Sequence, residues 1–345
     1  MKILSVIGTR PQYIKLAPIF HRFSLEKIQH QYIDTGQHYS KVLSDDLLNE
    51  LDLPQPIVNL RTGSKDANLQ IASIIESLNP ILNEVKPNFV LVYGDTNSTL
   101  GAAIAVKKLG IPLGHIEAGL RSFNNQMPEE INRILTDHCA TRLYAPTRTA
   151  MENLNHENLS NRALLTGDIM VEQLRKYSHE ISVEPSADVS YLVATLHRQE
   201  NIQSDNRVVS IFRQFAYIPM EVRVFAHPRL KQKIIDLNLK LAANIKILDA
   251  QPHRILIKEL VRSKGLITDS GGLQKEAYIL GKLCTTLRNE IEWVETLEDN
   301  WNVLCKELNL LPTLALREQP YKPPVAHYGE GKTSETILKD ILQWI

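Results

Sequence analysis

The sequence predicts an α/β protein built from two doubly wound parallel sheets, each in a domain of its own. Its 345 residues exceed the usual size of one hydrophobic core, so we expect two domains. Short β-branched segments alternate with segments of helical spacing along both halves, which favours parallel strands joined by right-handed crossovers. Hydrophobic residues make up 43% and charged residues 23%, as in globular proteins.

Apolar, β-branched segments mark the strands of both halves, and several are apolar enough to be buried on both faces. The predicted strands of the first half are Lys2–Ile7, Gln31–Asp34, Phe89–Tyr93, Pro112–Ile116 and Leu143–Ala145. Those of the second half are Tyr191–Thr195, Glu221–Phe225, Ile245–Leu248, Gly265–Thr268 and Cys284–Leu287. Helical spacing predicts helices at Leu69–Val85 and Ser98–Lys108, and a terminal helix over 331–345.

The predicted domain boundaries follow from this alternation. Residues 1–170 form the first domain and residues 171–330 the second, and the polar stretch Lys176–Ser190 is the best candidate for a linker. In such folds ligands bind beyond the carboxyl ends of the strands. We therefore expect the ligand in a cleft between the domains, and the functional residues in the loops that follow the strands.

Charge and cysteine content exclude several classes of function. Lys plus Arg (39) equal Asp plus Glu (39), so no net field attracts nucleic acid or an anionic membrane. No apolar run approaches the length of a membrane span, and the N-terminus enters an apolar β-like segment directly, so a cytoplasmic location is expected. The three widely spaced cysteines fit neither a disulfide framework nor a zinc site, and neither metal nor cofactor is expected.

Two turns have the composition of anion-binding sites. Gly8-Thr9-Arg10-Pro11 follows the first strand, and Arg10 and Lys15 could reach one phosphate group at the start of the next helix. Ser270, Gly271 and Gly272 follow the strand Gly265–Thr268, where two glycines let a backbone approach a pyrophosphate, and Glu276 could accept hydrogen bonds from a ribose. Both turns could instead be ordinary strand-to-helix connections that carry a solvated Arg or Glu.

Three carboxylates follow neighbouring strands of the first half. Asp95 and Glu117 come after two strands, and Glu129 opens the helix that follows the second of them. Grouped carboxylates suit proton transfer, because repulsion and burial separate their pKa values. Taken one by one, Asp95 could instead cap a helix, Glu117 could pair with Arg121, and Glu129 or its neighbour Glu130 could complement a helix N-terminus.

Histidine-containing loops follow three further strands. His197 and Arg198 follow Tyr191–Thr195, and His227 follows Glu221–Phe225. In the first half, Gln37 and His38 follow Gln31–Asp34 and could contact sugar hydroxyls or cap a turn. Each histidine could equally be structural, and His197 is the better catalytic candidate.

Together these segments resemble the non-hydrolysing UDP-N-acetylglucosamine 2-epimerase family. They cover nearly the whole chain in the order found in the family. The matching segments are GTRPQYIK (8–15), TGQH (35–38), VYGDTNST (92–99), GHIEAGLRS (114–122), MPEEINR (127–133), LHRQEN (196–201), AHPR (226–229), TDSGGLQKEA (268–277) and YGEGK (328–332).

The resemblance implies two Rossmann-like domains of the glycosyltransferase-B type, with the C-terminal helix 331–345 packed back on the first domain, and a homodimer. It implies a UDP-sugar substrate whose UDP is eliminated and then added again, so that the configuration at C2 inverts. The family places protic groups near C2 at the positions of Asp95, Glu117, Glu129 and His197. UDP would be held by Arg10, Lys15, Ser270, Gly271, Gly272 and Glu276.

Several departures from the family pattern bear on the substrate. Gln12 replaces a Glu, and Tyr39-Ser40 replaces residues that help bind a second, allosteric UDP-sugar, which argues against allosteric activation. The segments Ser122-Phe123-Asn124 and Glu292–Glu295 resemble a branch that includes UDP-2,3-diacetamido-2,3-dideoxyglucuronate 2-epimerases. That uronate is therefore the alternative substrate. The sequence is also compatible with a hydrolytic epimerase, a non-catalytic UDP-sugar-binding regulator or a glycosyltransferase.

Overall fold

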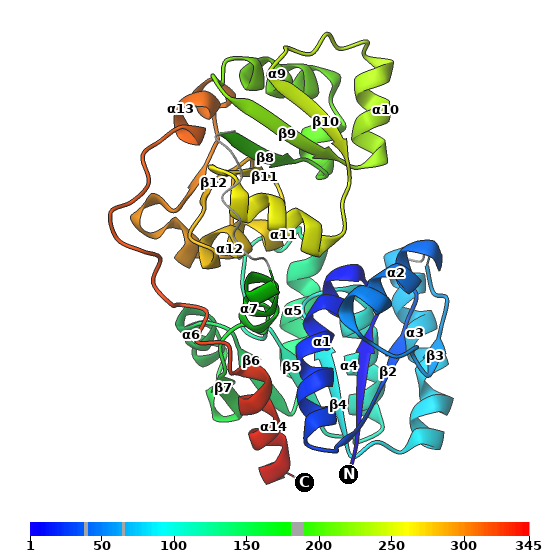
Figure 1. Cartoon of the computed structure of the whole chain (residues 1–345). Coiled ribbons are helices and arrows are strands. Elements are labelled where there is room, and N and C mark those ends of the chain that lie inside the picture. Colours follow the sequence, from blue (N-terminus) through cyan, green and yellow to red (C-terminus); the bar gives the residue numbers. More distant parts are fainter. Residues whose placement is uncertain (38–40, 64–65, 181–189, 345) are drawn as a thin grey trace. The chain divides into compact units, whose positions relative to one another are not determined.

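The structure, a computed structural model, describes residues 1–37, 41–63, 66–180 and 190–344 (Figure 1). The side chains of 41–45 and 178–180 are not among the described parts. The chain divides into two compact units, and each is considered by itself. Unit 1 comprises Met1–Arg175 and His327–Ile345, and unit 2 comprises Lys176–Ala326.

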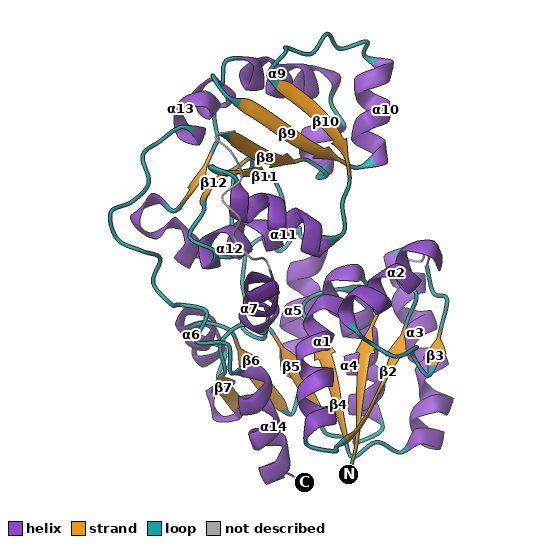
Figure 2. Cartoon of the chain, in the orientation of Figure 1, coloured by secondary structure: helices purple, strands orange, loops and turns teal. Residues whose placement is uncertain are grey.

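Unit 1 is built on a seven-stranded parallel sheet with the order β3-β2-β1-β4-β5-β6-β7 (Figure 2). Its strands are β1 (Lys2–Ile7), β2 (Gln29–Asp34), β3 (Val58–Asn59), β4 (Phe89–Tyr93), β5 (Leu113–Ile116), β6 (Arg142–Ala145) and β7 (Ala163–Leu165). The strand order reverses direction between β1 and β4, which makes this a doubly wound sheet.

Helices join the strands of unit 1 and cover its sheet. They are α1 (Arg10–Leu25), α2 (Lys41–Leu51), α3 (Ala67–Val85), α4 (Asn97–Lys108), α5 (Pro128–Cys139), α6 (Arg148–His156), the short η1 (Ser160–Arg162), the first part of α7 (Met170–Glu180) and α14 (Thr333–Trp344). The last residues of α7, from Lys176 on, belong to unit 2. Strands β1 and β4 are buried almost throughout because helices lie on both of their faces. The last helix belongs to this core: Ile337 and Ile341 of α14 are fully buried with residues of α1 and β1, and the carboxylate of Asp340 binds Arg142 Nε at 2.8 Å.

Unit 2 repeats the architecture with a six-stranded parallel sheet of order β10-β9-β8-β11-β12-β13. Its strands are β8 (Tyr191–Thr195), β9 (Glu221–Ala226), β10 (Ile245–Asp249), β11 (Gly265–Thr268), β12 (Leu283–Thr286) and β13 (Asn302–Leu304). Its helices are α8 (Gln199–Ile202), α9 (Asp205–Ala216), α10 (Pro228–Asp236), α11 (His253–Arg262), α12 (Gly271–Ile279), η2 (Val294–Asn300), η3 (Leu308–Leu310) and α13 (Leu311–Ala315).

These two sheets confirm the predicted fold class. One detail was wrong: Lys176–Glu180, predicted to be part of a polar linker, is the last turn and a half of α7. Tyr177 explains the difference, because its side chain is buried (1% exposed) and its ring lies 5.7 Å from that of His253, so packing holds this helix end. The middle of the predicted linker, 181–189, lies outside the described residues.

Within the described part of the chain, no helix is both long and apolar enough to cross a membrane.

Candidate functional site

The first candidate site of unit 1 begins at the turn between β1 and α1. Thr9 is the N-cap of α1, and Pro11 lies in its first turn as the sequence indicated. The side chain of Gln12, only 2% exposed, accepts hydrogen bonds from the N–H groups of Gly8 (2.8 Å) and Thr9 (3.1 Å), and its amide nitrogen donates to the carbonyl of Tyr93 (2.6 Å). An amide suits this position because it both donates and accepts. Gln12 therefore joins the Arg10 turn to the end of β4.

Lys15 and Glu117 form an ion pair at the same edge of the sheet. Lys15 lies on α1, and its ammonium contacts Oε2 of Glu117, which directly follows β5 and is 5% exposed. Glu117 has φ of +67°, a left-handed conformation that is strained for any residue except glycine. A Cβ at Gly94 would lie 3.4 Å from both Glu117 Oε2 and Lys15 Nζ, so the glycine lets the β4 turn pass close to the pair. The alternative pairing of Glu117 with Arg121 is wrong.

Asp95 follows the neighbouring strand β4, and two residues of α5 hold it. The guanidinium of Arg133 contacts Oδ2 of Asp95, and Asn132 Nδ2 donates to the Asp95 carbonyl at 3.0 Å. The carboxylate of Asp95 is still 35% exposed, so it is open to a ligand. Asp95 is not the cap of α4, since Thr96 takes that position and accepts from the N–H of Thr99.

Glu129 and Glu130 have different environments in the first turn of α5. Glu130 is buried (1% exposed): it accepts from the N–H groups of Ser122 (2.9 Å) and Phe123 (2.9 Å) and pairs with Arg133 at 2.9 Å. Glu129 is exposed beside the helix N-terminus. Glu130 is therefore a structural residue that shapes the 122–124 loop, and Glu129 is left available for chemistry.

Gln37 follows β2, and its side chain orders α4. Its Oε1 accepts hydrogen bonds from the N–H (3.0 Å) and the hydroxyl (2.7 Å) of Ser98, in the first turn of that helix. This favours the capping interpretation of Gln37. Its neighbour His38, and Tyr39-Ser40 after it, lie outside the described residues.

In unit 2, the turn after β11 exposes a helix N-terminus. Ser270 is the N-cap of α12, and its Oγ accepts from the N–H of Leu273, which leaves the hydroxyl proton free to donate outward. Gly271 and Gly272 are the first two residues of the helix, and no atom lies within 4 Å of a Cβ placed on Gly272. An anion can approach the backbone N–H groups here.

The neighbouring loop after β8 is organised by Asp269. This buried carboxylate accepts from the backbone N–H groups of His197 and Arg198, each at 3.1 Å, and from Asn201 Nδ2 at 3.1 Å. It also lies 2.9 Å from His197 Nδ1. Burial alone would raise the pKa of Asp269, but the contacts with His197, Asn201 and Arg198 hold it below its ordinary value. Asp269 thus stays ionised and orients the exposed His197 ring.

Glu276 lies one turn into α12 and is 5% exposed. Both of its carboxylate oxygens lie 3.0 Å from Nε2 of His253, the first residue of α11. That contact holds the carboxylate that we expected to bind a ribose, and it gives His253 a structural role. His227, by contrast, is an exposed N-cap of α10 whose side chain forms no capping hydrogen bond.

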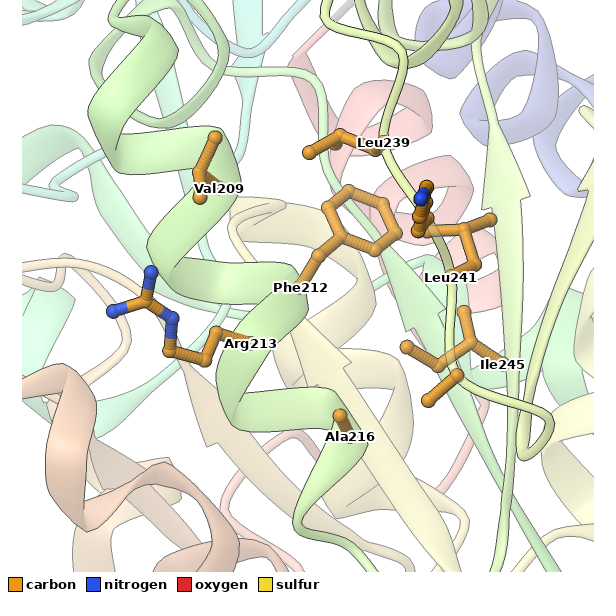
Figure 3. Close-up of a pocket in the computed structure, with 9 residues that line it drawn as sticks. Val209, Phe212, Arg213, Ala216, Leu239, Leu241 and Ile245 are labelled. Atoms are coloured by element: carbon orange, nitrogen blue, oxygen red, sulfur yellow. The ribbon is translucent and has the colours of Figure 1, made fainter.

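A cavity of about 330 Å³ in unit 2 does not belong to this site (Figure 3). It lies between α9 and the segment before β10, with Phe212, Leu239, Leu241 and Ile245 around it and Arg213 at its edge. Ile245 begins its strand, so the cavity is at the amino end of the sheet, whereas Ser270 and His197 follow carboxyl ends. Its place in the fold, rather than its size, separates it from the candidate chemistry.

Sequence reasoning missed several residues that hold the candidate groups. They are Arg133 and Asn132 for Asp95, Asp269 for His197, and His253 for Glu276. Arg133 and Asn132 lie in the matching segment MPEEINR, and Asp269 lies in TDSGGLQKEA, so the family resemblance could have identified these three residues. His253 gave no such signal, because its contact joins two helices, α11 and α12, whose ends only the folded sheet brings together.

The fold and the site define a class: an α/β protein of two Rossmann-like units, with carboxylates, basic side chains and a glycine-rich helix N-terminus at the carboxyl ends of its strands. The family model for UDP-N-acetylglucosamine 2-epimerase matches residues 23–342. The chain belongs to the UDP-N-acetylglucosamine 2-epimerase family.

Individual relatives agree with this family. A UDP-N-acetylglucosamine 2-epimerase of Methanocaldococcus jannaschii is 35% identical and matches 98% of both chains. A UDP-2,3-diacetamido-2,3-dideoxy-D-glucuronate 2-epimerase of Pseudomonas aeruginosa is 38% identical over 88% of both chains. The crystal structure of the M. jannaschii UDP-GlcNAc 2-epimerase in complex with UDP-GlcNAc and UDP matches all of both chains, with a TM-score of 0.89 and 34% identity.

Proposed function

We propose that this protein is a non-hydrolysing UDP-N-acetylglucosamine 2-epimerase, which interconverts UDP-N-acetylglucosamine and UDP-N-acetylmannosamine. One observation carries the proposal: in a chain of this family, the carboxylates of Asp95 and Glu117 stand at the ends of neighbouring strands, and Lys15 contacts the second. Removal of a proton from one face of a carbon and its return to the other face require two acid–base groups with different pKa values, and different surroundings provide that difference. A regulator that had lost catalysis would have no need of them.

The reaction is an elimination followed by an addition. A base removes the proton from C2 of the sugar, the C1–O bond breaks, and its electron pair leaves with the β-phosphate of UDP. The C1=C2 double bond of the glycal then takes UDP back at C1 while a proton is delivered to the opposite face of C2. Asp95, Glu117 and Glu129 of unit 1 and His197 of unit 2 are the proposed acid–base groups.

The proposed anion-binding groups stabilise UDP as the leaving group. The negative charge that develops on UDP during elimination is favoured by Arg10 and Lys15, and by the α12 N-terminus with Ser270, Gly271 and Gly272. Glu276 binds the ribose hydroxyls, and Arg198 and His227 contribute further polar contacts. Gln37 acts by ordering α4, as its contacts with Ser98 indicate.

The test is incubation of the purified protein with UDP-N-acetylglucosamine in deuterium oxide, followed by NMR of the C2 proton. We expect the manno isomer to form and C2 of both isomers to gain deuterium. Binding without exchange would support the regulator instead, release of free amino sugar would support hydrolysis, and turnover of the diacetamido uronate alone would change the substrate. Each of these results contradicts the proposal.

We also infer that the enzyme works as a homodimer in the cytoplasm. The family resemblance suggests the dimer, and the three free thiols fit a reducing compartment. Light scattering on the purified protein and fractionation of the source cells test the two statements. A monomer that turns over at the full rate would contradict the first, and activity confined to an extracellular fraction would contradict the second.

A further inference from the structure

A buried ring lies beneath the site of Glu117 and has no part in the mechanism above. His115 is in β5, two residues before Glu117, and its side chain is fully buried. Its Nε2 lies 2.7 Å from the carbonyl oxygen of Gly94, and its Nδ1 lies 2.7 Å from Oδ1 of Asp137 on α5. A carbonyl oxygen can only accept a hydrogen bond, so Nε2 carries a proton.

The partner on the other side of the ring is an ionised carboxylate. Oδ2 of Asp137 accepts from the backbone N–H of Gly119 at 3.0 Å and from Arg121 at 2.7 Å. Burial alone would raise the pKa of Asp137, but His115 and Arg121 hold it below its ordinary value. Because this carboxylate has no proton to give, Nδ1 of His115 is the donor in their hydrogen bond. Both ring nitrogens are thus protonated, and the ring is a cation.

Cationic and anionic side chains alternate in this part of unit 1. Asp137 lies between the His115 ring and Arg121, and Arg121 donates to Glu157 by two hydrogen bonds of 2.7 and 2.8 Å. Glu157 is 27% exposed, and its Oε2 also lies 3.4 Å from Nε2 of the exposed His138. Charges are tolerated in a protein interior when they are paired and hydrogen-bonded. With a neutral ring, the fully buried Asp137 would have Arg121 as its one cationic partner among the described residues, and Arg121 also pairs with Glu157.

The ring fixes the turn that leads to Asp95. The N–H of Gly94 donates to the carbonyl of Ile116 (3.0 Å), and its carbonyl accepts from His115, so both polar groups of this residue are held. Gly94 has φ of +64° and packs against the carboxylate of Glu117. Because Asp95 follows directly, a movement of Gly94 would change the place of Asp95 relative to Glu117.

We propose that His115 is a positioning residue, which as a buried imidazolium hydrogen-bonded to Asp137 and to the Gly94 carbonyl clamps the Gly94 turn and sets Asp95 beside Glu117. The effect on catalysis rests on the proposed function of those two carboxylates. The protonation state does not, so it can be tested separately.

The protonation state is measured by long-range ¹H–¹⁵N NMR of the histidine-labelled protein from about pH 6 to about pH 9, the range in which ordinary histidines lose their charge. We expect both ring nitrogens of His115 to carry protons, as their contacts with the Gly94 carbonyl and the Asp137 carboxylate require. The variant His115→Gln assigns the signal. One unprotonated nitrogen in His115 at neutral pH would overturn the proposal.

The catalytic effect is measured with Asp137→Asn, which keeps the size of the side chain and removes its charge. The ring should then become neutral, and kcat should fall by about 10-fold or more with KM changed less than about twofold, because geometry rather than binding is altered. The control is Asp340→Asn, which removes another buried carboxylate of the same unit from its partner Arg142 and should leave kcat unchanged.

A full kcat in folded Asp137→Asn, or an equal loss in Asp340→Asn, would overturn the positioning role. If Asp137→Asn does not fold, His115→Gln decides the same point, since a wild-type kcat without the imidazolium would also overturn it. Wild-type protein that forms no isomer and exchanges no C2 proton would refute the proposed function instead, and the NMR titration would still decide the charge of His115.

Discussion

Oδ1 of Asp269 lies 2.9 Å from Nδ1 of His197, although the two residues end different strands of the unit 2 sheet. Asp269 is fully buried, whereas the His197 side chain is half exposed, so the carboxylate orients the ring from below and leaves Nε2 to the solvent side. A carboxylate in this relation to a histidine sets its tautomer and stabilises its charged form. His197 is therefore prepared for proton transfer before any ligand binds.

Asp269→Asn should slow isomer formation by about 100-fold, with a smaller effect on UDP affinity. The amide retains an acceptor for the N–H groups of His197 and Arg198, but it places no negative charge beside the His197 ring. Steady-state kinetics and UDP titration measure the two effects. Asp249→Asn, at the exposed end of β10 in the same unit, is the matched control and should change neither. Unchanged turnover in Asp269→Asn would remove this pair from the mechanism.

Glu117→Gln should leave UDP affinity nearly unchanged and slow isomer formation by a factor on the order of 100 or more, as loss of an acid–base group does. The amide keeps the volume of the side chain and can still accept a hydrogen bond from Lys15, but it cannot exchange a proton. The control Glu172→Gln alters a half-buried glutamate that binds Ser334 in the same unit. Turnover equal to that of the control would exclude Glu117 as an acid–base group.

Gly272→Ala separates ligand binding from folding. A methyl group at this position meets no atom within 4 Å, so thermal stability should change by no more than about 1 kcal/mol, in either direction. If phosphate oxygens lie against this helix turn, the methyl group obstructs them, and the dissociation constant of UDP should rise by about tenfold or more. Calorimetric titration measures it. Wild-type affinity would place the pyrophosphate elsewhere.

His30 makes unit 1 sensitive to acid. Its Nε2 hydrogen-bonds Ser5 at 2.8 Å, and burial lowers its pKa from 6.5 to about 3. The folded state disfavours the charged His30 ring, whereas the unfolded state does not. The free energy of unfolding is therefore highest above the unfolded pKa of 6.5, and it falls as the pH decreases from there toward 3. The loss should approach about 1.4 kcal/mol per pH unit.

The measurement is hydrogen exchange of the β1 and β2 amides of the wild type and of His30→Phe, each corrected for the intrinsic pH dependence of exchange. The variant has no ring to protonate, so its free energy of opening should depend less steeply on pH below 6.5 than that of the wild type. The same dependence in both proteins would show that His30 stays charged or accessible in the folded state.

The apolar segments of the sequence predicted the longer strands well, whereas the shortest strands were not predicted. The five main strands of each sheet were found within two residues at either end, because they have four to six residues rich in apolar and β-branched side chains. Strands β3, β7 and β13 were missed. They have two or three residues each and lie at sheet edges, where neither length nor alternation distinguishes a strand from a loop.

The local environment of some candidate residues was predictable from the sequence, but the residues that contact them were not. Turn composition identified Ser270 and Gly272, since cap and glycine preferences are local. The contact of Arg133 with Asp95, by contrast, joins residues that are 38 positions apart and depends on how α5 lies on the sheet. The same holds for the choice between Glu129 and Glu130, which differ in burial although they are neighbours in one helix turn.

Breakage of the anomeric C1–O bond is the central chemical claim, and an isotope tests it directly. UDP-N-acetylglucosamine is prepared with ¹⁸O between C1 and the β-phosphorus, and its NMR spectrum is followed during the reaction. We expect the label to move into the non-bridging positions of the β-phosphate at least as fast as the manno isomer forms, because released UDP can rotate before it adds back. Complete isomerisation with the label still in the bridge would contradict elimination.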